Sequence, residues 1–94
     1  VVVATDAKLN QSEATRISVI AHDGIARSIF PSHTQFDGDI VFTVSTGKKE
    51  MKDTHNDLMV LGNAAAICIS RSIARAIYNA KPEKNDIKKC WSEL

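Results

Sequence analysis

The chain has 94 residues, of which 44% are hydrophobic and 24% charged, and its formal net charge is +1. This length accommodates one small domain and leaves little room for a large catalytic cleft built by this chain alone. The near-zero net charge does not favour binding to nucleic acid. Two cysteines are too few for a disulfide framework, so we expect a cytoplasmic protein. We find no signal peptide and no run of the roughly 20 apolar residues that a membrane span needs.

The first residues predict a buried strand. Residues 1–6 (Val-Val-Val-Ala-Thr-Asp) are mostly apolar and β-branched, and no initiator Met, polar tail or helix cap precedes them. We therefore expect the chain to be the downstream piece of a longer polypeptide. Some hydrolases cut themselves in two and use the newly exposed N-terminal residue as nucleophile. Val1 has no nucleophilic side chain, so such a residue would lie just ahead of it.

A helix is expected from about residue 11. Asn10 and Glu13 have the spacing of a capping box, and small or apolar residues then recur on one helical face as far as Ile25. A glycine within this face, Gly24, indicates close packing against a neighbouring element. Pro31 is incompatible with a continuing helix and marks its end.

A second strand is expected at residues 39–46, after a loop at residues 32–38 that ends in an Asp-Gly turn signal. Its apolar side chains alternate, with Val41 on one face. The apolar side chains on the opposite face are Ile40, Phe42 and Val44. Residues 47–50 form a polar break after the strand.

A second, long helix is predicted from a cap at Asp53 or Thr54 to about Ala80. Residues 58–69 are apolar nearly all round, so the helix must be covered on more than one side, and other polypeptide must supply part of that cover. Cys68 lies in this run and is expected to be a buried small hydrophobic residue.

The fold class that follows is α/β, with a β-α-β-α unit forming a single piece over residues 1–94. Pro82 stops the second helix and leaves residues 83–94 as a C-terminal tail. We expect one more short helix at residues 85–94 of the tail, anchored by Ile87, Cys90 and Trp91.

Asp37 and Asp39 flank Gly38 before the second strand, and they are the strongest candidates for chemistry. Residues i and i+2 of an extended chain point to the same side, so the two carboxylates are expected to lie close together. Such a pair could accept a proton or orient a hydroxyl or an amine. A solvated Asp-Gly turn is the alternative interpretation of the same residues.

The three histidines do not indicate a metal site. His22, His33 and His55 lack the tight spacing of zinc ligands, both with one another and with the cysteines, so we expect no metal ion and no other cofactor. His22 is expected to be a hydrogen-bonded helix residue. His33 lies in the loop before the two aspartates, where a hydrogen bond that orders the loop is the common role.

Two further patterns are weak. Residues 46–49 (Thr-Gly-Lys-Lys) fail the phosphate-loop pattern, because Phe42 stands at the position of its first glycine and Lys49 replaces its Ser or Thr. Arg71 and Arg75 share a helix face without interleaved aromatic residues, which is typical of a solvated surface and not of a nucleic-acid interface.

Several segments together resemble one family. The segments are residues 3–9 (VATDAKL), 21–27 (AHDGIAR), 31–39 (PSHTQFDGD) and 41–47 (VFTVSTG). Their order and spacing resemble the small C-terminal β subunit of the self-cleaving L-aminopeptidase/D-esterase family, which includes β-peptidyl aminopeptidases and the 6-aminohexanoate-oligomer (nylon oligomer) hydrolase. The Ala-His-Asp-Gly and Asp-Gly-Asp blocks are specific in combination, whereas beyond Gly47 the resemblance rests on the long apolar helix.

The resemblance implies a precursor that cleaves itself before a Thr or Ser, which becomes the N-terminal nucleophile. That residue would stand a few positions ahead of Val1 and is not in this sequence. A larger α subunit and this β subunit would stay together in a four-layer αββα sandwich, and αβ units would assemble further. The free α-amino group of the nucleophile can act as its base. The substrate would be a small peptide or amide, with no nucleic acid or membrane as partner.

The resemblance also implies a role for Asp37 and Asp39. They match two aspartates near the nucleophile in the nylon-oligomer hydrolase branch, whereas the β-aminopeptidase branch has Ser and Glu at these places. Two other functions stay open. Related ornithine acetyltransferases have a similar self-cleaved architecture, which would make the chain part of an acyl transferase. Alternatively, the chain is a non-catalytic subunit whose long helix builds an oligomer interface.

Overall fold

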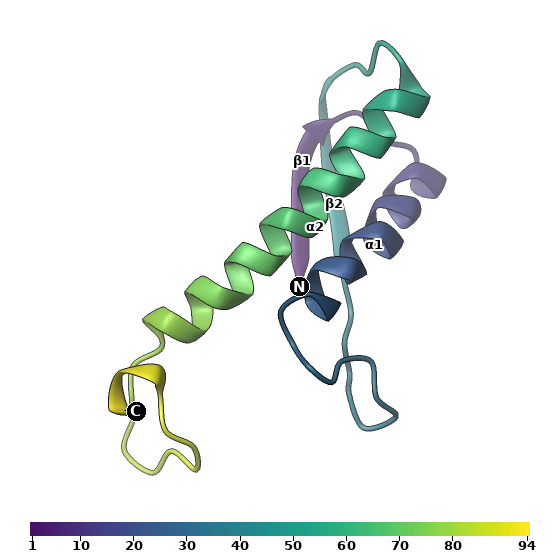
Figure 1. Ribbon diagram of the computed structural model, residues 1–94. Coiled ribbons are helices and arrows are strands. Elements are labelled where there is room, and N and C mark those ends of the chain that lie inside the picture. Colours follow the sequence, from purple (N-terminus) through teal and green to yellow (C-terminus); the bar gives the residue numbers. More distant parts are fainter.

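The computed structural model describes all 94 residues as a β-α-β-α unit followed by an irregular tail (Figure 1). In chain order, its elements are strand β1 (Val2–Ala7), helix α1 (Gln11–Ala26), strand β2 (Phe42–Lys49) and helix α2 (Thr54–Asn79). The strands pair in parallel in one two-stranded sheet, which confirms the predicted α/β unit. Helix α2 runs well past the end of the sheet and carries the tail away from it (Figure 1).

Both helices begin at the predicted caps. The Asn10 side chain accepts a hydrogen bond from the Glu13 backbone N–H at 2.8 Å, and Glu13 Oε1 accepts one from the Asn10 N–H at 3.0 Å. Asp53 caps α2 by accepting from the Asn56 N–H at 3.4 Å. Helix α1 ends at Ala26, before Pro31 is reached, and the Ser28 hydroxyl donates to the carbonyl oxygen of Gly24 at 3.0 Å.

Small residues let the two helices pack closely on one side of the sheet. A Cβ added to Gly24 would collide with the carbonyl oxygen of Ala66 and lie 2.9 Å from the Cβ of Ile69, so α1 approaches the backbone of α2 at this point. Gly62 gives the reciprocal contact, since its Cβ would lie 2.8 Å from Cδ1 of Ile20. The core between and beneath the helices consists of Ile17, Ala21, Ile25, Val41, Ala65, Ala66 and Ile69. The close packing predicted from Gly24 is thereby confirmed.

The other face of the sheet is open and apolar. Val41 is buried under the helices, whereas Ile40, Phe42 and Val44 are 51%, 57% and 50% exposed. Val2 of β1 joins them at 65% exposure. The face beneath the helices contains polar side chains, among them Thr43, whose hydroxyl lies 2.6 Å from that of Ser18. The predicted alternation of side chains is confirmed, and the face with Ile40, Phe42 and Val44 points away from the helices.

The bounds of the second strand differ from the expected residues 39–46. Strand β2 begins at Phe42, whose N–H donates to the Val1 carbonyl at 2.9 Å. It continues through the expected polar break to Lys49, because Gly47 adopts a φ of +72° and forms an irregularity in the pairing. The Lys8 N–H then donates to the Lys49 carbonyl at 2.7 Å.

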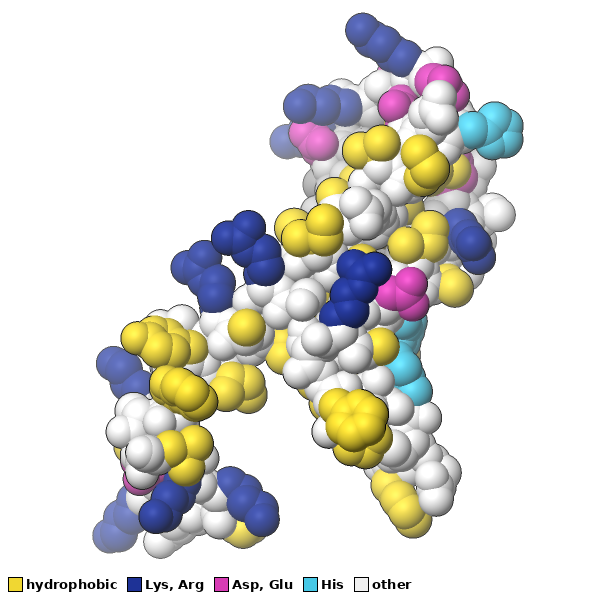
Figure 2. All heavy atoms as spheres, in the orientation of Figure 1, with side chains coloured by type: hydrophobic (Ala, Val, Ile, Leu, Met, Phe, Trp, Pro, Cys, Tyr) yellow, Lys and Arg dark blue, Asp and Glu magenta, His cyan; other side chains and the backbone are white.

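The tail forms only a short 3-10 turn (Trp91–Glu93), not the expected helix over residues 85–94. Ile87 is 94% exposed and anchors nothing, whereas Trp91 lines a groove together with Ile73 and Tyr78 of α2. Figure 2 shows hydrophobic side chains gathered at this end of the molecule. Too little apolar surface is buried here to hold a helix together.

Cys68 was predicted to be buried, and this is wrong. Its side chain is exposed and lines an apolar groove between α2 and strand β1, which has Val1, Val3, Leu61 and Ala65 among its walls. Helix α1 covers the opposite side of α2, so the Cys68 side of α2 and the free edge of β1 have no cover within this chain.

Helix α2 is long and apolar enough to cross a membrane by length and composition alone, since it has 26 residues and an 18-residue stretch of it has a mean hydropathy of 1.3. The sequence was expected to contain no such segment. Helix α2 contains no unbroken apolar run of about 20 residues, but a high mean hydropathy over 18 residues is compatible with a few polar side chains. The contacts of Gly62, Ala65, Ala66 and Ile69 with α1 and the core account for the hydrophobicity of one side of this helix.

We predict that Gly24→Ala destabilises the protein by about 1–3 kcal/mol, because the added methyl group meets backbone and cannot be accommodated by a rotamer change. Thermal or urea unfolding measures the effect. Gly38→Ala is the matched control, since nothing lies within 4 Å of a Cβ there and its φ is not in the left-handed region. Equal stability of the two variants would contradict the close helix contact.

Candidate active site

The candidate site lies at the end of the sheet where β1 begins. The loop that joins α1 to β2 extends past this end, so the start of the chain and residues 27–41 lie at the same end of the molecule (Figure 1). The nitrogen of Val1 donates to the carbonyl oxygen of Ile40 at 2.9 Å, directly after Asp39. The start of the chain is thus hydrogen-bonded next to the aspartate pair.

Both aspartates lie in this loop, and their side chains accept hydrogen bonds from the backbone of the same loop. Asp37 Oδ2 accepts a hydrogen bond from the Thr34 N–H at 3.1 Å, and Asp39 Oδ2 accepts one from the His33 N–H at 2.7 Å. The two carboxylates therefore reach adjacent peptide groups, although the residues precede the strand and are not part of it. Neither Oδ1 is engaged in a hydrogen bond within the chain, so one oxygen of each carboxylate is available to an outside group.

Two histidines join this site, and the sequence did not indicate that they meet. His33 Nδ1 lies 3.4 Å from Asp39 Oδ2, and the centroid of its ring lies 5.0 Å from that of His22 on α1. The predicted loop-ordering hydrogen bond of His33 is present through its backbone. His22 contacts the ring of His33 and makes no side-chain hydrogen bond within its helix, contrary to the expectation. The spacing of His22, His33 and Asp39 in the sequence could not predict this contact, because they lie on a helix, in a loop and before a strand.

The arrangement fits the handling of protons and positive charge. Carboxylates that already accept backbone hydrogen bonds are held in place, and a free oxygen on each can accept a hydrogen bond from an amine or a hydroxyl. The hydrogen bonds to these carboxylates come from backbone N–H groups, and no hydroxyl or thiol of the chain is hydrogen-bonded to them.

Comparison with known proteins identifies the family. A profile of peptidase family S58 matches residues 1–88, which is nearly the whole chain. This chain belongs to peptidase family S58. The resemblance to the L-aminopeptidase/D-esterase family is thereby confirmed.

Individual relatives are longer than this S58 chain. It is 36% identical over 91 residues to an uncharacterised aminopeptidase of Mycobacterium bovis, covering 86% of this chain and 26% of the relative. An uncharacterised aminopeptidase of Mycobacterium leprae is 37% identical over 90 residues, covering 85% of this chain and 25% of the relative. The chain therefore spans about a quarter of the length of these relatives.

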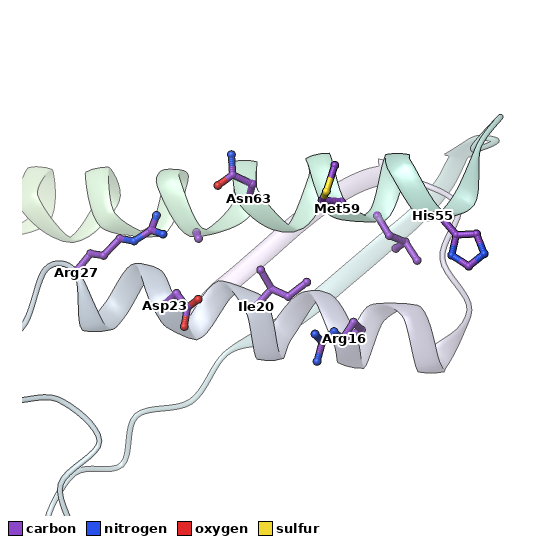
Figure 3. A pocket seen from close by; sticks show the side chains of 9 residues that line it. Arg16, Ile20, Asp23, Arg27, His55, Met59 and Asn63 are labelled. Atoms are coloured by element: carbon purple, nitrogen blue, oxygen red, sulfur yellow. The ribbon is translucent and has the colours of Figure 1, made fainter.

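A further groove of the S58 chain lies on the helix side. The groove lies between α1 and α2 and has a volume of about 420 Å³, and Figure 3 shows the side chains that line it. Its labelled lining residues are Arg16, Ile20, Asp23, Arg27, His55, Met59 and Asn63. None of them is a residue of the 31–39 loop, so the groove is separate from the aspartate pair. His55 lies here, away from the other two histidines.

The remaining candidates lie apart from the site. Arg71 and Arg75 are exposed on α2, as expected for a solvated surface. Desolvation, followed by the negative charges of Glu93 and Asp86, raises the pKa of the Cys90 thiol. Cys90 is therefore held as a thiol near neutral pH, which does not suit a nucleophile.

Proposed function

We propose that this chain is the C-terminal portion of a self-cleaving amide-bond hydrolase, of the aminopeptidase or 6-aminohexanoate-oligomer hydrolase type. An N-terminal Thr or Ser just ahead of Val1 is its nucleophile. Membership of a peptidase family and the aminopeptidase relatives support the hydrolase, and coverage of only a quarter of those relatives supports a larger partner.

The observation that carries the proposal is the strand register. Val2 pairs with Phe42 and Val3 with Thr43, at a constant offset along the parallel strands. Continued backwards at this offset, the residue ahead of Val1 falls opposite Ile40 and the next one opposite Asp39. Because each residue advances a strand by about 3.3 Å, a nucleophile two or three positions upstream comes within reach of both aspartates.

The chemistry proposed for this site is acyl transfer through the N-terminal hydroxyl. The hydroxyl oxygen attacks the substrate carbonyl while its proton passes to the free α-amino group of the same residue, which acts as the base. That proton then goes to the departing amine as the C–N bond breaks. Water attacks the resulting ester, regenerates the hydroxyl and releases the acid.

Asp37 and Asp39 have a supporting role in this scheme. Their free Oδ1 oxygens would accept hydrogen bonds from the N–H groups of the neutral α-amino group and so orient its lone pair toward the hydroxyl. Their negative charge stabilises the positive charge that develops when the amine takes up the proton. The larger partner would supply the donors to the oxyanion and most of the substrate pocket.

The open sheet face supports an assembly with that partner. Val2, Ile40, Phe42 and Val44 form an apolar surface on a sheet that lacks a second layer. Sheets of this kind bury such a face against a second sheet about 10 Å away. A four-layer αββα sandwich, with this chain's helices as one outer layer, satisfies that requirement.

We expect Asp37→Asn and Asp39→Asn each to lower self-cleavage or hydrolysis by at least about 10²-fold, because each variant keeps an acceptor oxygen for the loop but loses the charge. The assay uses amino-acid amides, β-peptides and 6-aminohexanoate oligomers with the full-length protein. Asp23→Asn, in the groove on the helix side, is the control and retains activity. Near-normal turnover in both loop variants would refute the assignment. Transfer to an added amine in preference to water would favour the acyl-transferase alternative.

We also expect Val44→Asp to prevent stable association with the larger partner, because it would bury a carboxylate in an apolar interface at a cost of several kcal/mol. Co-purification and size-exclusion chromatography measure the assembly. Val19→Asp is a matched control, since Val19 is 54% exposed and Val44 50%, but Val19 lies on α1 and not on the open sheet face. An intact assembly with Val44→Asp would show that this face is not the interface.

A further inference from the structure

We infer that His33 is a positioning residue for Asp39, held in turn by His22, and that it sets the direction in which the free oxygen of Asp39 points. The inference rests on the proposed function, because it assigns a role within the same site. His33 itself would touch neither the substrate nor the nucleophile.

The first support is a double contact on one oxygen atom. The backbone N–H of His33 donates to Asp39 Oδ2 at 2.7 Å, and the Nδ1 atom of the same residue lies 3.4 Å from that oxygen. The backbone hydrogen bond holds this oxygen, and the ring nitrogen beside it further restricts rotation about the terminal torsion of the carboxylate, which is otherwise broad. Its second oxygen, Oδ1, is then left in a defined place for the group that the site must orient.

The second support is the backbone of His33. Its φ is +54°, in the left-handed region that only a few per cent of residues other than glycine adopt, histidine being one of the more frequent among them. Such a conformation costs about 1 kcal/mol or more, and it persists where the surroundings require it. Here it brings both nitrogens of one residue to the same carboxylate oxygen.

The third support is His22. It follows Ala21, which is fully buried in the core, so its place on α1 is fixed. Its ring is tilted by 51° to that of His33, with the centroids 5.0 Å apart, which is a favourable aromatic arrangement. The ring of His33 is 40% exposed and would otherwise be free to rotate, so this contact ties the loop to the rigid helix.

Precise orientation matters at such a site. A displacement of about 1 Å in a group that aligns a nucleophile can cost about 10²-fold in rate. The aspartate is therefore useful only if its direction is fixed before the nucleophile is engaged. Asp37 receives no comparable side-chain contact, since its acceptor bond comes from the Thr34 backbone.

The test compares His33→Gly with His33→Asn in the full-length protein. Both residues tolerate a positive φ, but only asparagine keeps a side-chain donor close to the place of Nδ1. We expect His33→Gly to lower kcat by about 10- to 100-fold with little change in KM, and His33→Asn to stay within about 3-fold of the wild type. His55→Asn is the matched histidine control and should not differ from the wild type.

A double-mutant cycle with Asp39→Asn shows whether His33 acts through Asp39. If it does, His33→Gly causes no further loss once Asp39→Asn is present. The inference would be overturned if the kcat losses of His33→Gly and Asp39→Asn multiply in the double variant. It would also be overturned if His33→Gly keeps the wild-type kcat, or if His33→Asn is as slow as His33→Gly.

A measurement that needs no substrate separates this inference from the proposed function. The ring nitrogen NMR signals of His33 should shift on Asp39→Asn, because the carboxylate beside Nδ1 loses its charge. Unchanged signals would overturn the role of His33 alone. A wild-type protein that neither cleaves itself nor hydrolyses any of the substrates would overturn the proposed function and this role together.

Discussion

The parallel pairing of the chain start with residues 40–43 is the constraint on which the rest depends. It brings the nitrogen of Val1 to the carbonyl of Ile40 and the Phe42 N–H to the carbonyl of Val1. A parallel pair needs a long crossover, and here α1 and the loop after it provide that connection. The same loop contains both aspartates, so one topological requirement places carboxylates beside the beginning of the first strand.

The two helices cover one face of the sheet, whereas the opposite face has no cover within the chain. Helices α1 and α2 interlock through Gly24 and Gly62, yet only 9 of 94 residues are buried. The radius of gyration is 15.7 Å, whereas a compact domain of this length has a radius of about 12 Å. The open sheet face, the free edge of β1 beside Cys68 and the overhanging half of α2 all lack cover within the chain. This distribution is expected of a segment that folds together with other polypeptide, as membership of S58 and the length of the relatives also indicate.

The features that were predicted correctly are those that depend on residues close together in the sequence or on the absence of a side chain. The caps at Asn10 and Asp53, the order of the elements and the close packing at Gly24 depend on residues near one another in the chain or on a missing side chain, and they were correct. The exposure of Cys68 was predicted wrongly, because an apolar run looks the same whether this chain or a partner covers it. The meeting of His22, His33 and Asp39 was not predicted, because it depends on how a loop with an unusual φ folds back on a helix.

The most direct test of the central claim is the intact mass and N-terminal sequence of the small polypeptide in the purified, active protein. The account predicts a fragment that begins with Thr or Ser two or three residues ahead of Val1, and its formation should be slowed by Asp39→Asn. An active protein that remains one uncleaved polypeptide, or a small fragment that starts at a residue without a nucleophilic side chain, would contradict it.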